Sequence, residues 1–229
     1  LGWTDEIQHT NVSGEDQDLS HDRITALRLG VSLNRCLTGC LGIDFQFSRG
    51  FDIASRSQGD VGKGTPLSRS SGKNNFSHFN LDTTYAVALD KNLEFNINTG
   101  GQLSLDDLLN SEQSSITGPD KLSGFTSGSI SGDESWYFRG QLNYKKKLSN
   151  KLTLTPYVYG ATGVSYTLTP TATENRATAA RSIGLGLKMD GIDNYFFDKN
   201  ISAKVEYSKN WATGVLEDVS DVRLNKQHL

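Results

Sequence analysis

The segment from Lys121 to Asn150 reads KLSGFTSGSISGDESWYFRGQLNYKKKLSN, and its second half decides the fold. From Trp136 to Tyr144, apolar and polar side chains alternate behind a loop rich in glycine and serine. The apolar set, with Gly140 among it, is Trp136, Phe138, Leu142 and Tyr144. The polar set is Tyr137, Arg139, Gln141 and Asn143. Because successive side chains of a β-strand point to opposite faces, this pattern predicts a strand between an apolar and a polar medium.

The same alternation recurs along the chain and predicts an all-β fold. Eight strands are expected, at residues 27–34, 41–49, 79–89, 93–103, 136–144, 152–159, 183–189 and 201–208. A ninth, short strand is expected within residues 1–8. Residues 103–113 could form at most one short helical turn, and no amphipathic helix competes with the strands.

The connections between the predicted strands differ in length in a regular way. Short ones, at 35–40, 90–92 and 145–151, alternate with long ones, at 50–76, 104–134 and 161–181, and a last connection follows at 190–200. Outer-membrane β-barrels have short turns at one end and long loops at the other. A soluble β-sandwich has no reason to sort its loops by length. We therefore predict an antiparallel transmembrane β-barrel, whose polar lumen would also account for a mean hydropathy of −0.46.

Aromatic residues lie near the ends of the predicted strands. They are Phe76, Phe79, Trp136, Tyr137, Tyr144, Tyr195, Phe196, Phe197 and Trp211. This distribution is typical of the aromatic girdles that barrels place at the two membrane interfaces. Membrane lipid is therefore one expected partner.

Several classes of function are disfavoured by the composition. The net charge is −3 and no basic stripe is present, which argues against a nucleic-acid partner. The sequence contains no apolar run of about 18 residues, so it encodes no transmembrane helix. The four histidines are scattered without the spacing of a metal site. We expect no cofactor and no enzymatic activity.

The two cysteines lie close together, at Cys36 and Cys40 in the segment NRCLTGCLG. In an oxidising compartment they could form a disulfide across a hairpin turn around Thr38 and Gly39. The alternative is two free thiols in a turn. A metal site would need more ligands than the neighbouring sequence offers.

The quoted segment also resembles a known family. Gly124-Phe125, Ser131-Gly132-Asp133 and the run from Trp136 to Arg139 are similar to the sixth extracellular loop and following strand of two-partner secretion transporters of the haemolysin secretion/activation type. The resemblance implies an outer-membrane protein that passes an unfolded partner exoprotein without nucleotide hydrolysis. We expect Gly124 and Phe125 to anchor the loop in the lumen, the alternative being an ordinary flexible loop tip. The alternation directs Arg139 into the lumen, where it could line the translocation path or pair with a carboxylate of a neighbouring strand such as Glu206.

Two residues depart from the family pattern. The family has an arginine at the loop tip, where this chain has Ser123, and a wall aspartate that pairs with it, where this chain has Ala161. Losing only one partner would leave an unpaired charge partly buried. Because both are absent, we expect the loop to be held more weakly, or by packing of Phe125.

The resemblance also bears on the extent of the domain. Family barrels have 16 strands preceded by two POTRA domains, so residues 1–229 are expected to be the C-terminal part of such a barrel, without its POTRA domains, early strands and last strand. The first alternative is a small passive outer-membrane channel or structural barrel, and the second is a soluble binding module. The basic segment at 145–151 is expected to be a solvated turn rather than a docking patch.

Overall fold

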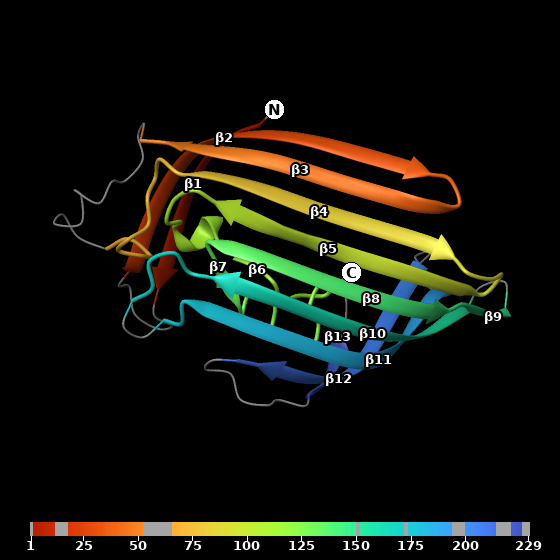
Figure 1. Ribbon diagram of the computed structural model, residues 1–229. Helices are drawn as coiled ribbons and strands as arrows, with labels where there is room; N and C mark the ends of the chain where they lie inside the picture. Colours follow the sequence, from red (N-terminus) through yellow and green to blue (C-terminus); the bar gives the residue numbers. More distant parts are fainter. Residues whose placement is uncertain are drawn as a thin grey trace.

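The computed structural model describes residues 2–11, 18–52, 66–149, 152–171, 174–193, 200–213 and 221–225, and most of them lie in antiparallel strands (Figure 1). The elements are β1 (Gly2–Asn11), β2 (Asp18–Cys36), β3 (Gly39–Phe51), β4 (Ser77–Ala88), β5 (Leu93–Ser104), η2 (Asn110–Glu112), β6 (Ser114–Ser115), β7 (Ser131–Gly132), β8 (Glu134–Tyr144), β9 (Lys146–Ser149), β10 (Leu152–Tyr166), β11 (Ala177–Asp193), β12 (Asn200–Ala212) and β13 (Asp221–Asn225). In the part of the chain that the structure describes, no helix is long and apolar enough to cross a membrane.

One large sheet contains every long strand. Its order is β1-β2-β3-β4-β5-β8-β10-β11-β12-β13, and β9 pairs with β10 outside this path. Strands consecutive in this order are antiparallel neighbours, as in an up-and-down barrel wall. The described strands form an open sheet with β1 and β13 at its two edges. All eight predicted strands are present, as β2–β5, β8 and β10–β12, and the predicted ninth is β1.

The sheet is curved, and the connections sort to its two ends as predicted. Figure 1 shows the short turns at one end and the long connections at the other. The turn between β4 and β5 spans residues 89–92, whereas the loop between β5 and β8 spans residues 105–133. This loop lies on the concave side of the sheet, where β6 and β7 form a small ladder of their own.

The two faces of the sheet have opposite chemistry. On β8 the convex face carries Trp136, which is 48% exposed, while Arg139 on the concave face is 2% exposed. The convex side chains of the other strands are mainly aliphatic and exposed, as with Val31, Val158 and Leu185. A surface that is apolar toward the outside and polar toward the inside is typical of a wall between lipid and a hydrated lumen.

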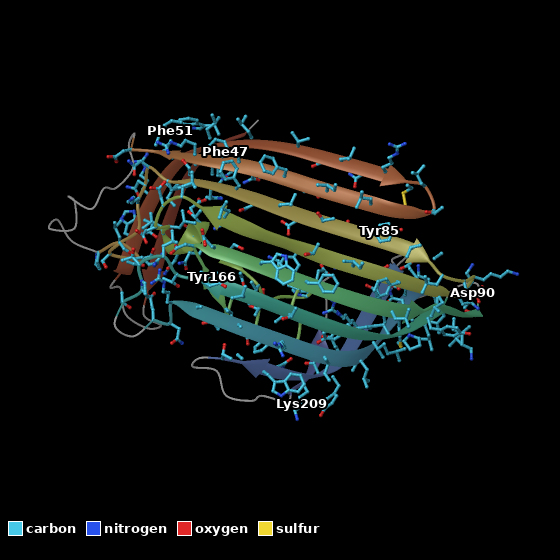
Figure 2. The ribbon with its side chains drawn as sticks, in the orientation of Figure 1. Phe47, Phe51, Tyr85, Asp90, Tyr166 and Lys209 are labelled. Atoms are coloured by element: carbon cyan, nitrogen blue, oxygen red, sulfur yellow. A yellow bond between two sulfur atoms is a disulfide. The ribbon has the colours of Figure 1, made fainter. Side chains whose placement is uncertain are left out.

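Aromatic side chains lie toward both ends of the convex face. In Figure 2, Phe47, Phe51 and Tyr166 lie toward the loop end and Tyr85 toward the turn end. Two of the predicted girdle residues do not belong there. Phe76 is fully buried against loop residues, and Tyr137 is 6% exposed because its position in β8 faces the lumen. Tyr195, Phe196 and Phe197 lie outside the described residues.

Three expectations about boundaries were wrong. The loop predicted at 161–181 is shorter, because β10 continues to Tyr166 and β11 begins at Ala177. The segment predicted as a turn at 145–151 contains the strand β9, which pairs with the start of β10; its last two residues lie outside the described residues. The strand β13 was not expected at all.

The β2–β3 turn holds the two cysteines. Cys36 and Cys40 are directly opposite each other in the ladder, and a disulfide joins them. It closes a hairpin at the short-turn end of the sheet.

Candidate functional site

The loop at 105–133 packs into the concave face through a small apolar core. Loop residues Ile116, Leu122 and Ile130 are each at most 4% exposed. The wall residues that they meet are Tyr137, Tyr157, Tyr159, Ala161 and Ala180, and Phe125 packs at the edge of this core. Burial of these side chains supplies a non-directional driving force that keeps the loop inside the lumen.

The tip of the loop is held by Ser123, which contacts two charged residues of the wall. Its hydroxyl Oγ donates to Oε1 of Glu206 on β12 at 2.5 Å. The same oxygen accepts a hydrogen bond from Nη1 of Arg139 on β8 at 2.6 Å. Hydrogen bonds to charged groups are stronger than those between neutral groups, so one serine joins the tip firmly to two strands.

Arg139 and Glu206 are also paired with each other, at 3.6 Å between Nη2 and Oε2. The Arg139 guanidinium lies 3.7 Å from the ring centre of Tyr159 and donates to the carbonyl of Lys121. Glu206 accepts a further hydrogen bond from Tyr157 at 2.6 Å. Because each charge has several partners on the wall, the pair satisfies the requirement for burying ions.

Gly124 allows the tip to approach the wall closely. Its carbonyl accepts a hydrogen bond from Nδ2 of Asn210 at 2.9 Å. A Cβ at Gly124 would overlap the Asn210 amide and the Ser208 hydroxyl. A side chain at this position would therefore have to displace Asn210, whose amide holds the Gly124 carbonyl.

A second attachment joins the start of the loop to the opposite part of the wall. Glu112 on η2 accepts hydrogen bonds from Nη2 and Nη1 of Arg28 on β2, at 2.6 and 3.0 Å. Its Oε2 lies 3.0 Å from Nε2 of His78 on β4. Burial favours a higher pKa for Glu112, but the hydrogen bonds from His78 and Arg28 outweigh it, and the pKa lies below its ordinary value. His78 itself is 1% exposed, because the loop covers it.

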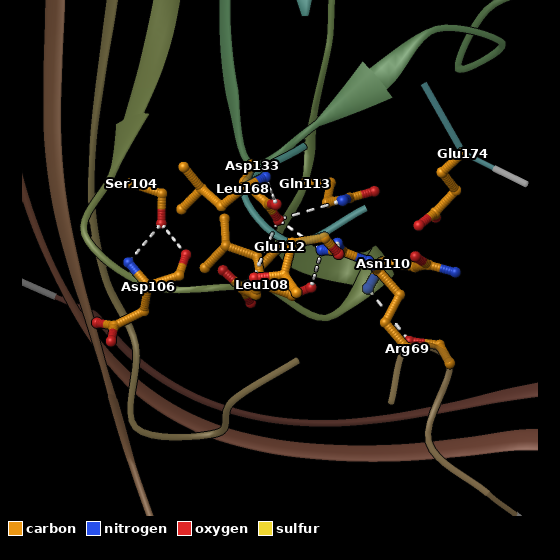
Figure 3. A network of polar contacts seen from close by, with 12 residues as sticks. Arg69, Ser104, Asp106, Leu108, Asn110, Glu112, Gln113, Asp133, Leu168 and Glu174 are labelled. Carbon is orange, nitrogen blue, oxygen red and sulfur yellow. Dashed lines mark hydrogen bonds and ion pairs between the residues drawn. The ribbon is translucent and has the colours of Figure 1, made fainter. Parts of the chain in front are cut away.

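A third attachment ties three long connections together at the loop end (Figure 3). Asp133, fully buried, accepts from Nη1 of Arg69 at 2.6 Å. It also accepts from the backbone amides of Leu108 and Leu168. Arg69 lies between β3 and β4, and Leu168 lies between β10 and β11. One carboxylate therefore holds the ends of three loops.

Two polar cavities flank the loop. One, of about 260 Å³, lies between the loop and β2, β4, β5 and β8, with Arg28, Asp82 and Tyr137 in its lining. The other, of about 460 Å³, lies between Asp120 of the loop and the wall toward the short-turn end, with Gln141 and Lys204 in its lining. The loop therefore leaves polar space against the concave face on two of its sides.

The comparisons with known proteins agree with this architecture. The family model of the haemolysin secretion/activation proteins ShlB/FhaC/HecB matches residues 4–189, most of the chain. The chain belongs to this family. It is accordingly an outer-membrane protein of the two-partner secretion type. No curated protein sequence matches it significantly.

One solved structure has a similar fold. CdiB from Escherichia coli is 17% identical, with a TM-score of 0.66 over 92% of this chain. The match covers 37% of CdiB, so this chain spans little more than a third of that protein.

Most of the site residues predicted from the sequence lie in the loop at 105–133 or contact it. Gly124, Phe125 and Arg139 meet at the tip, and Asp133 lies at the loop's return to β8. Gly132 packs so close to Ser165 and Tyr166 that a side chain would overlap them, and Ser131 is in the β6–β7 ladder. Trp136 is not part of the site, since it points to the convex face.

Sequence reasoning missed several partners. Asn210, Arg69, Glu112 and Arg28 were not singled out. Their contacts join residues that are far apart in the sequence. The sequence showed only that each of them is polar and lies at a lumen-facing or loop position. The family's arginine and aspartate are absent from this chain. Instead, Ser123 forms hydrogen bonds with two charged residues that both belong to the wall, Arg139 and Glu206.

Proposed function

We propose that this chain forms part of an outer-membrane pore for an unfolded partner exoprotein, and that the loop at 105–133 is a plug that leaves the lumen during transport. The proposal is supported mainly by the placement of the loop. It occupies the polar concave face between two polar cavities and would obstruct an extended chain.

A polar lumen suits an extended polypeptide as cargo. Side chains such as Gln141, Asn143 and Asn96 offer hydrogen bonds in place of water along the wall. No cofactor is needed for this step. Folding of the cargo outside the cell would remove it from the reverse reaction and so give the transport a direction.

The tip attachment is suited to release because both charges remain on the wall. When Ser123 withdraws, Arg139 and Glu206 keep each other, as well as Tyr159 and Tyr157 respectively. No buried charge is left without a partner, which is the most costly consequence of breaking an ion pair. The family arrangement, with one charge on the loop and one on the wall, would separate the two charges at the same step.

A reversible tether between loop and wall tests the proposal. A Cβ at Gly163 on β10 would lie 3.3 Å from Cβ of Ile116, close to the separation that a disulfide requires. Ile116→Cys/Gly163→Cys, with Cys36 and Cys40 replaced by serine, can be assayed for secretion in cells before and after reduction. Each single-cysteine variant in the same background is the control.

We expect the oxidised tether to block secretion and reduction to restore it. Secretion that is equal in both redox states would contradict the plug and favour the passive barrel. A block that appears equally in the single-cysteine variants would show only that Ile116 or Gly163 is needed for folding.

We also propose that residues 1–229 form the C-terminal part of a larger barrel that is preceded by POTRA domains. The open edges at β1 and β13 support this, because unpaired backbone groups are costly in lipid. Mass spectrometry of the protein purified from outer membranes would test it. A mature chain no longer than these residues, folded without a partner chain, would contradict it.

A further inference from the structure

The convex face carries a cationic cluster at the loop end of β11 and β12. Arg181 and Lys209 are both exposed, and Figure 2 shows Lys209 projecting outward from the sheet. Trp211, 39% exposed, is directly opposite Arg181 in the ladder, and Lys209 is opposite Ile183. Arg181 and Lys209 are therefore diagonal neighbours, about 7–8 Å apart at their Cα atoms.

The cluster has a defined shape. The Nζ of Lys209 lies 5.4 Å from the ring centre of Trp211, which draws the ammonium toward the indole. On its other side Arg181 is opposite Thr162 of β10. Among the residues that the structure describes, the ladder places no carboxylate opposite Arg181 or Lys209.

The neighbouring residues on the same face indicate where the cluster lies relative to the membrane. Toward the short-turn end, the same face of β11 and β12 continues with Ile183, Leu185, Val205 and Tyr207, each more than 40% exposed. This apolar band faces the hydrocarbon. An exposed Arg or Lys is destabilising at the bilayer midplane and close to neutral near the interface, so the two cations belong at the level of the headgroups.

The loop end of the sheet identifies the leaflet. In outer-membrane barrels the long loops are extracellular, so Arg181 and Lys209 lie at the outer leaflet. Their charge is complementary to the phosphate groups of lipid headgroups there. A guanidinium can form a bidentate pair of hydrogen bonds with phosphate, and an ammonium adds a point charge.

We propose that Arg181 and Lys209, with Trp211 beside them, form a binding site for a phosphorylated glycolipid of the outer leaflet. Arg181 binds a headgroup phosphate, and Lys209 contacts the same phosphate or a neighbouring one. The indole of Trp211 packs at the boundary between sugar and acyl chains, where tryptophan is favoured.

Native mass spectrometry of the purified, delipidated protein tests the site. The probes are a diphosphorylated lipid A, the same lipid after enzymatic dephosphorylation, and phosphatidylglycerol. The variants are Arg181→Ala, Lys209→Ala and the double variant. Lys146→Ala is the control, because Lys146 is opposite Leu154 and is exposed at the short-turn end of the same face.

We expect the affinity for the phosphorylated glycolipid to fall about fivefold in each single variant and about thirtyfold in the double variant. Lys146→Ala and wild type should bind it equally, and dephosphorylation should reduce wild-type binding as much as the double substitution does. Circular dichroism shows that each variant is folded. Equal binding of the phosphorylated and dephosphorylated lipids, unchanged binding by the double variant, or equal loss in Lys146→Ala would each overturn the site. Binding of phosphatidylglycerol as tight as that of the glycolipid would overturn the assignment to the outer-leaflet lipid.

Discussion

Removal of the Ser123 hydroxyl should release the loop tip without disturbing the wall. Ser123→Ala deletes the hydrogen bonds to Glu206 and from Arg139, at 2.5 and 2.6 Å. Each is a bond to a charged group, which contributes about 1.5–3 kcal/mol. The two charges keep each other, so we take the low end of that range, a total of about 3 kcal/mol of docking free energy. Because 1.4 kcal/mol is a factor of ten, the undocked population should rise about 100-fold.

The undocked population can be measured through Leu122. This side chain is fully buried between loop and wall, so a cysteine in its place reacts with a water-soluble maleimide only when the loop leaves. We would introduce Leu122→Cys into a protein whose native cysteines are serine, and compare labelling rates with and without Ser123→Ala. Ser127→Ala is the matched control, because Ser127 lies in the same loop but is exposed.

We expect a labelling rate about 100-fold higher in Ser123→Ala and within about twofold of the parent in Ser127→Ala. Equal rates in the two serine variants would refute the reasoning, since the tip would then be held by packing alone. A rate that is already fast in the parent would show that the loop does not rest on the wall.

Three further substitutions probe the other attachments. Gly124→Ala should undock the tip, because its Cβ would overlap Asn210, whereas Gly160→Ala has open space around it and should change neither the labelling rate at Leu122→Cys nor the melting temperature. Arg69→Ala leaves Asp133 buried without its cation and should lower the free energy of unfolding by about 3–5 kcal/mol in urea titrations, with Lys73→Ala, an exposed pair to Asp106, as the near-neutral comparison. Glu112 contributes stability above its ordinary pKa of 4.5, because binding to Arg28 and His78 lowers the pKa in the fold, and this contribution is lost as the pH falls through the lowered value. The melting temperature of wild type should therefore exceed that of Glu112→Gln at neutral pH, and the gap should close below about pH 4.5; a gap that is constant with pH would contradict this role.

The sheet could be predicted from sequence because one local rule governs it. From Trp136 to Tyr144, every convex-facing position of β8 is apolar or glycine, so the alternation alone identified the strand and its two faces. The same rule failed where the side chains on the two faces of a strand differ little in polarity. The C-terminal part of β10, with Gly163 and Ser165 facing inward, resembles a loop in composition. Its pairing with β11 identifies it as a strand. The lysine-rich β9 likewise depends on backbone pairing that its side chains do not indicate.

The site was predictable only where the family resemblance reached. It directed attention to Gly124, Phe125 and Asp133, and from the loss of the tip arginine we expected a weaker attachment or packing of Phe125. Phe125 does pack against the apolar core of the loop, but the polar attachment through Ser123 was not expected. A short hydroxyl at Ser123 can contact two wall charges that no local pattern connects, since Arg139 and Glu206 are brought together by the curvature of the sheet.

The central claim, that cargo passes through the space occupied by the loop, can be tested by cross-linking from neighbouring wall positions. A photo-reactive amino acid would replace Gln141, which lines the lumen, or Leu142, the next residue on the lipid face. Each protein would be illuminated in cells that express a partner exoprotein arrested by a folded domain at its C-terminus. The account predicts cross-links to the exoprotein from position 141 and none from position 142. Cross-links from 142, or none from 141 while secretion is arrested in the pore, would contradict it.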